Sequence, residues 1–137
     1  MTRRALSAVA LAVVPALAAA GCGGGANPYT AKGTAPCLRT KGFTKVTTDP
    51  RRVGFIAGFA ENGGVRAASP GGNVVTIAFA ADAASANSTR RAFRRHAPPA
   101  LRPHIKDIMA SKRNAVLVWT VTPDPKALAD AEGCLHS

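Results

Sequence analysis

The most conspicuous chemistry in this sequence is a basic cluster at residues 90–96, Arg-Arg-Ala-Phe-Arg-Arg-His. The segment belongs to a predicted helix that begins after Asp82, and on that helix Phe93 should face the core. Guanidinium groups bind phosphates and carboxylates, so the pattern predicts an anion-binding surface, with a solvated helix face as the alternative. Four arginines form the predicted site: Arg90, Arg91, Arg94 and Arg95.

The whole chain is basic as well. Its 137 residues carry 18 Lys and Arg against 7 Asp and Glu, a formal net charge of +11. Any partner selected by charge is therefore anionic, such as a lipid headgroup or a cell-wall polymer. The length is that of one modest domain and excludes two independent catalytic domains or a multi-span membrane protein.

Motifs for catalysis are missing. The sequence has no Gly-x-Ser-x-Gly elbow, no His-Glu-x-x-His and no phosphate-binding loop. Three aspartates fall at predicted helix starts, where capping explains them: Asp49, Asp82 and Asp124. The histidines are too scattered for a metal triad: His96, His104 and His136. We therefore expect a protein that is not an enzyme and holds neither a metal nor a cofactor.

The first 22 residues have the pattern of an export signal. Arg3 and Arg4 form a positive start, and the uncharged run from Ala5 to Ala20 is shorter than the roughly 20 residues that span a bilayer. Small residues close the segment, as they do before a cleavage site.

Ala19-Ala20-Gly21-Cys22 resembles the lipobox of bacterial lipoprotein precursors, which usually opens with Leu where this sequence has Ala19. The resemblance implies that residues 1–21 are removed and that Cys22 receives a diacylglyceryl group, which anchors the chain to the cell membrane. The alternatives are cleavage after Ala20, which would release a soluble protein from Gly21, and an uncleaved anchor.

The remaining thiols, Cys37 and Cys134, are expected to form a disulfide, because an exported protein normally pairs its cysteines and lipidation accounts for Cys22. Two free thiols or a metal pair are the alternatives, but neither cysteine has a second Cys or His at a convincing ligand spacing. A bridge that closes a loop of this length is worth about 4–5 kcal/mol in the chain-entropy model.

Hydrophobic periodicity and turn residues predict the elements that must position these groups. The segment 50–61 fits a helix and, less well, a strand. Helices are predicted over 37–41, 50–61, 82–96, 101–111 and 124–135. Strands are predicted over 43–48, 65–69, 73–80 and 115–121, the middle two joined as a hairpin by Pro70-Gly71-Gly72.

Without the terminal helices, and with 82–96 and 101–111 counted as one helical connection, this order is β-α-β-β-α-β, which predicts a ferredoxin-like α+β sandwich of two layers. The extra N- and C-terminal helices would be joined by the Cys37–Cys134 disulfide. Residues 22–35 show no periodicity and are expected to be a lipid-anchored flexible tether, followed by a single domain over 36–137.

The sequence thus predicts a lipid-anchored protein on the extracytoplasmic face of the cell membrane that binds or scaffolds an envelope component without catalysing a reaction. Nucleic acid is not an expected partner, because the chain is exported and has no recognisable nucleic-acid module. A carrier or sensor of a small anionic ligand is the alternative, and a minor secreted hydrolase is a third.

Overall fold

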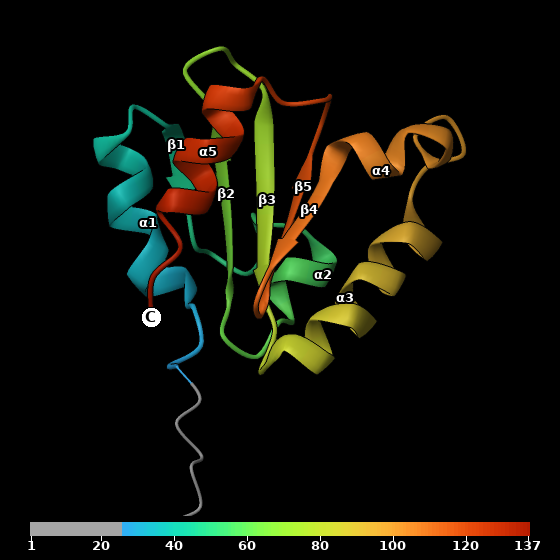
Figure 1. The fold of residues 1–137 in the computed structure, drawn as a ribbon, viewed down its shortest axis with the longest axis horizontal. Coiled ribbons are helices and arrows are strands. Elements are labelled where there is room, and N and C mark those ends of the chain that lie inside the picture. The colour runs from blue at the N-terminus through green and yellow to red at the C-terminus, as the bar shows by residue number, and fades with distance from the viewer. Residues whose placement is uncertain (1–25) are drawn as a thin grey trace, which may run out of the picture.

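A computed structural model describes residues 26–137, in which helices alternate with short strands (Figure 1). The expected signal peptide and the expected lipidation site Cys22 lie outside these residues. The elements are α1 (Ala31–Thr40), β1 (Thr44–Thr47), α2 (Phe55–Gly58), β2 (Gly64–Ala68), β3 (Val74–Phe79), α3 (Ala83–His96), the 3₁₀ turn η1 (Arg102–His104), α4 (Ile105–Ile108), β4 (Met109–Lys112), β5 (Ala115–Trp119) and α5 (Pro125–Gly133).

The strands form one antiparallel sheet in the order β1-β2-β3-β5-β4. In the central strand β3, Ile77 lies opposite Val65 of β2 and Leu117 of β5. Because successive side chains of a strand alternate between faces, Ile77 and its partners share one face, while Thr76 and Ala78 belong to the other.

Helices cover both faces of the sheet (Figure 1). α1 and α5 pack on the face of Ile77, whereas α2 and α3 pack on the face of Ala78. The domain is therefore built of three layers, with the sheet in the middle.

The mixed helix-and-strand class and the antiparallel sheet agree with the prediction, but the strand order is not that of a ferredoxin-like sandwich. A β-α-β unit needs a helix long enough to carry the chain back along the sheet. α2 has only four residues, so β2 returns directly beside β1 in the antiparallel direction. The helices also cover two faces instead of the single face expected.

The helix predicted over 101–111 is wrong in its second half. The helical turn α4 ends at Ile108, and the next four residues form β4. β4 pairs with β5 across the tight turn Arg113-Asn114, which places Met109 opposite Val118. A partner strand so close in sequence satisfies the backbone, and this pairing outweighs the helical spacing of the apolar residues.

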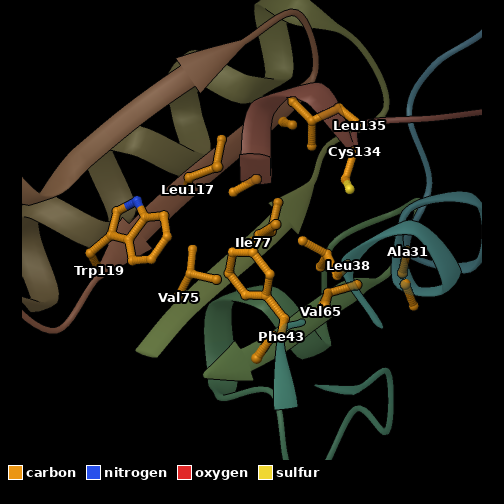
Figure 2. Packing of buried hydrophobic residues seen from close by; sticks show 14 of the residues in the cluster. Ala31, Leu38, Phe43, Val65, Val75, Ile77, Leu117, Trp119, Cys134 and Leu135 are labelled. Atoms are coloured by element: carbon orange, nitrogen blue, oxygen red, sulfur yellow. The ribbon is translucent and has the colours of Figure 1, made fainter. Parts of the chain in front are cut away.

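The larger core lies between the sheet and the helices α1 and α5 (Figure 2). Trp119 is its largest fully buried side chain, and the ring of Phe43 lies 6.5 Å from it, centroid to centroid. Leu38 of α1 and Leu135, which follows α5, close this layer. Burial of a side chain of this size contributes about 1.5–3 kcal/mol, so the helices are held chiefly by such contacts.

The predicted disulfide is confirmed: Cys37 and Cys134 are bonded, with their Cα atoms 5.3 Å apart. Cys37 belongs to α1 and Cys134 caps the C-terminal end of α5, so the bond joins the two helices of one layer.

The ordered domain begins before residue 36, the boundary expected from the sequence. The side chain of Thr30 caps α1 by accepting a hydrogen bond from the backbone N–H of Gly33. Before it, the backbone N–H and C=O of Tyr29 are both bonded to the side chain of Asn114, each at 2.8 Å. Residues expected to form a tether therefore belong to the fold.

Candidate functional site: an apolar groove between α2 and α3

The predicted anion-binding arginines lie on α3. Arg91, Arg94 and Arg95 are exposed, whereas Arg90 is half-buried. In the described part of the chain both ion pairs involve Asp130, so no carboxylate neutralises these four groups. Arg94 and Arg95 also lie in the last turn of the helix, where positive charge stabilises the negative end of the helix dipole. Their capacity to bind an external anion stays a prediction.

Phe93 faces the sheet, as its position on the predicted helix requires. It is half-buried and packs against two small clusters on the α2–α3 face, one around Ala78 and one around Val116. Four of the six buried residues in these two clusters are alanines, so this side of the sheet has few large buried side chains.

An apolar groove of about 540 Å³ opens between α2 and α3 on this side of the sheet. Thr76 of β3 and Val118 of β5 line it from the sheet, and Phe93 and His96 line it from α3. The α2 side is formed by residues 53–57, and Arg66 of β2 contributes a guanidinium group. Among these lining residues in the described chain, none is acidic.

A second, smaller hollow of about 150 Å³ continues from the groove. The two spaces share Ile56, Phe93, His96 and Val118, so they adjoin. The remaining lining residues are all apolar and come from α4 and the segment before it: Ala97, Pro98, Leu101, Ile105 and Ile108. The spacing of Leu101, Ile105, Ile108 and Met109 predicts the helix over 101–111, and all but Met109 line this hollow.

Two aromatic rings lie at the α2 side of the groove: Phe55 lines it, and Phe59, the residue after α2, contacts Phe55. Phe55 and Phe59 are each 79% exposed, and their ring centroids lie 5.0 Å apart. Only one other large apolar side chain among the described residues is so open, Val121 at 59%. Water-exposed aromatic pairs of this kind mark surfaces that meet another apolar surface.

The sequence predicted a longer helix here, over 50–61. The helix starts only at Phe55, because Gly54 has a φ of +95°, which ends helical geometry and which glycine adopts readily. The apolar residues at helical spacing in this segment are Val53, Ile56, Ala57 and Ala60, and of these Val53 and Ala57 are buried. The missed signal is the outward pair Phe55 and Phe59, four positions apart, which makes this short segment apolar on every side.

The histidines and acids form no metal site in the described residues. There, no three His, Cys, Asp or Glu side chains come together in an arrangement that could hold a metal ion. His96 lies at the groove, whereas His104 lies in η1 and His136 follows α5. Asp82 and Asp124 cap α3 and α5, as predicted, by accepting bonds from Ser85 and Ala127.

Comparison with protein-family models, with curated proteins and with solved structures finds no match to this chain. In residues 26–137, no helix is both long and apolar enough to cross a membrane.

Proposed function

We propose that this protein is a lipid-anchored, non-catalytic binding domain of the cell envelope, and that the α2–α3 groove receives an apolar chain of its ligand. The observation that carries the proposal is the apolar groove with the exposed rings of Phe55 and Phe59 beside it. Apolar pockets with a few polar groups at one side are the usual form of ligand sites.

The lining supports binding over catalysis. Its titratable groups are the imidazole of His96 and the guanidinium of Arg66, and the lining includes no carboxylate that could act with them as a general acid or base.

The anchor rests on the export pattern of residues 1–22 and on cysteine pairing. Because Cys37 and Cys134 are bonded to each other, Cys22 is the odd cysteine of a chain whose disulfide fits an oxidising compartment outside the cytosol. Lipidation accounts for that odd thiol.

The anchor is tested by the intact mass of the protein extracted with detergent from its native cells. We expect a chain that begins at Cys22 and is heavier than its amino acids by the attached acyl groups. A lipid-free chain that begins at Gly21 would contradict the anchor.

The groove is tested with N-phenyl-1-naphthylamine, an uncharged apolar dye that fluoresces when it leaves water. The protein is the chain from residue 22 with Cys22→Ser, so that no attached lipid competes. We expect saturable dye binding that is lost when Thr76→Phe fills the groove and is weakened several-fold by Phe55→Ser. Val121→Ser, which removes an exposed apolar side chain elsewhere, is the matched control and should bind as the parent does. Equal binding by all variants would contradict a site in the groove.

A further inference from the structure

A cationic hollow lies next to the apolar groove on the same face of the sheet. Its volume is about 260 Å³, and Lys45, Arg52 and Arg66 line it together with the hydroxyl-bearing Thr47. Arg66 also lines the groove, and it pairs in register with Thr76 on the groove side. The apolar space and the cationic space therefore adjoin at one guanidinium group.

The three cations are not neutralised from within the described chain. Both ion pairs there are made by Asp130, which does not line this hollow. The nearest acid in the sequence, Asp49, accepts a hydrogen bond from the backbone N–H of Arg51 at 3.0 Å and is not part of the lining either. Three gathered positive charges repel one another, and an anion between them would remove that repulsion.

Lys45 reaches this position through an unusual backbone. Its φ is +51°, and the pairing of β1 with β2 shifts register between Thr44 and Thr47, as at a β-bulge. Bulges re-aim side chains, and a left-handed conformation at a residue other than glycine is strained. Strain of this kind gathers at binding sites, so the bulge is a second observation that points to the hollow.

We propose that the ligand is an anionic lipid with a phosphate group. Lys45, Arg52 and Arg66 bind the phosphate, and the acyl chain runs from Arg66 along the groove, past Val118, into the smaller apolar hollow. A phosphate offers several acceptor oxygens to three converging cations, which is the match that charge-assisted hydrogen bonds require. This inference rests on the proposed function and adds the class of ligand.

The test compares ligands that share a chain and differ in the head. Dodecyl phosphate or the uncharged dodecyl glucoside is added, below its micelle concentration, to the Cys22→Ser chain with the naphthylamine dye bound. The measured quantity is the concentration that displaces the dye. We expect dodecyl phosphate to displace the dye at a concentration about tenfold lower than dodecyl glucoside requires. This advantage should decline as salt is added. Inorganic phosphate alone should leave the dye bound and should raise the melting temperature only weakly.

In the variant Lys45→Asn/Arg52→Gln/Arg66→Gln, the two amphiphiles should displace the dye at concentrations within about twofold of each other, while the dye itself still binds. Asn is chosen because it tolerates the left-handed backbone at residue 45. Arg66→Gln alone, at an exposed position, provides the same test with less change to the fold. The matched control Arg91→Gln/Arg94→Gln/Arg95→Gln removes the same charge from α3 and should keep the tenfold advantage.

Each other outcome overturns the inference in a recognisable way. Equal displacement of the dye by both amphiphiles would contradict the anion site, while the apolar groove would stand as proposed. Loss of the advantage in the α3 control would place the anion on the arginine cluster instead. Tight binding of inorganic phosphate would identify the free ion as the ligand. Failure of the dye to bind at all would contradict the proposed function itself.

Discussion

Asn114 is the residue that fixes where the folded chain begins. Its buried side-chain amide accepts from the N–H of Tyr29 and donates to the carbonyls of Tyr29 and Ala80, each at 2.8 Å. Residues 85 positions apart are thereby joined, and Arg113 adds a contact by lying 4.2 Å from the centre of the Tyr29 ring. No sequence pattern near Tyr29 predicts these hydrogen bonds, and for this reason the sequence indicated a tether there.

We predict that Asn114→Ala destabilises the domain by about 1–3 kcal/mol, because it leaves buried backbone groups without partners. Urea unfolding measures the loss, and faster amide exchange at Tyr29 would locate it. Asn73→Ala is the matched control: half-buried Asn73 makes a similar pair of bonds to the backbone of Val121, but these bonds are exposed to water. Equal losses for the two variants would contradict the role of burial.

The carboxylate of Asp82 makes the start of α3 sensitive to acid. Hydrogen bonds from Ser85 hold the pKa of Asp82 below its ordinary value of 3.8. The stabilisation is therefore fully present above about pH 4 and is lost as the pH falls through the lowered pKa. We predict that Asp82→Asn, whose neutral amide caps the helix at any pH, reduces the loss of stability between pH 4 and pH 2 seen in thermal melts. Glu61→Gln, a change at an exposed carboxylate outside this cap, should leave the loss of stability between pH 4 and pH 2 unchanged.

At the scale of elements, prediction from the sequence worked where a local pattern decides the structure. The strands β3 and β5 and the capped helices α3 and α5 lie within the predicted segments, and β2 begins one residue before its predicted segment. Each has its signal inside its own residues: turn glycines, alternating apolar residues or an Asp at the helix start.

Prediction failed where residues distant in the sequence determine the local structure. β4 exists because β5 lies beside it, and α1 begins at Ala31 because Asn114 and the C-terminal residues hold the preceding backbone. The cationic hollow shows the same limit. Lys45, Arg52 and Arg66 are separated by 7 and 14 positions and meet only through the bulged pairing of β1 with β2. The cluster on α3 is conspicuous in the sequence simply because it is local.

The placement of α2 depends on a glycine in the neighbouring strand. A Cβ atom at Gly64 would lie 2.5 Å from the carbonyl oxygen of Ala57, which backbone atoms cannot accommodate without a shift. We predict that Gly64→Ala destabilises the domain by about 1–3 kcal/mol and displaces α2, so that dye binding in the groove weakens as well. Gly71→Ala, at a hairpin position with open space, should change neither quantity. A stable variant with normal dye binding would contradict this account.

For the whole molecule, the disulfide ties the two ends of the domain into one layer. Cys37 and Cys134 are 97 positions apart, and in the chain-entropy model a loop of that size is worth about 4–5 kcal/mol. We predict a loss of this size in urea unfolding of Cys37→Ala/Cys134→Ala, and a similar loss when the parent is reduced. A loss below about 1 kcal/mol would show that packing of α1 and α5 suffices without the bond.

The proposed anchor and the observed start of the fold together limit how the domain sits on a membrane. The carbonyl of Asn27 accepts hydrogen bonds from Arg113 and from Ser137, at the end of the domain where α1 begins (Figure 1). Only five peptide steps join Cys22 to Asn27, a span of at most about 18 Å. A lipidated Cys22 therefore holds this end of the domain close to the bilayer, and the hairpin between β2 and β3, at the other end of β3, points away.

We predict that a fluorescent donor at Ser137→Cys transfers energy to acceptor-labelled lipid headgroups more efficiently than a donor at Gly71→Cys, in the lipidated chain on vesicles. An insertion of ten Gly and Ser residues after residue 25 is the control. It lengthens the reach of the tether, so the difference between the two positions should shrink. Equal transfer from both positions without the insertion would mean that the domain is not oriented by its anchor.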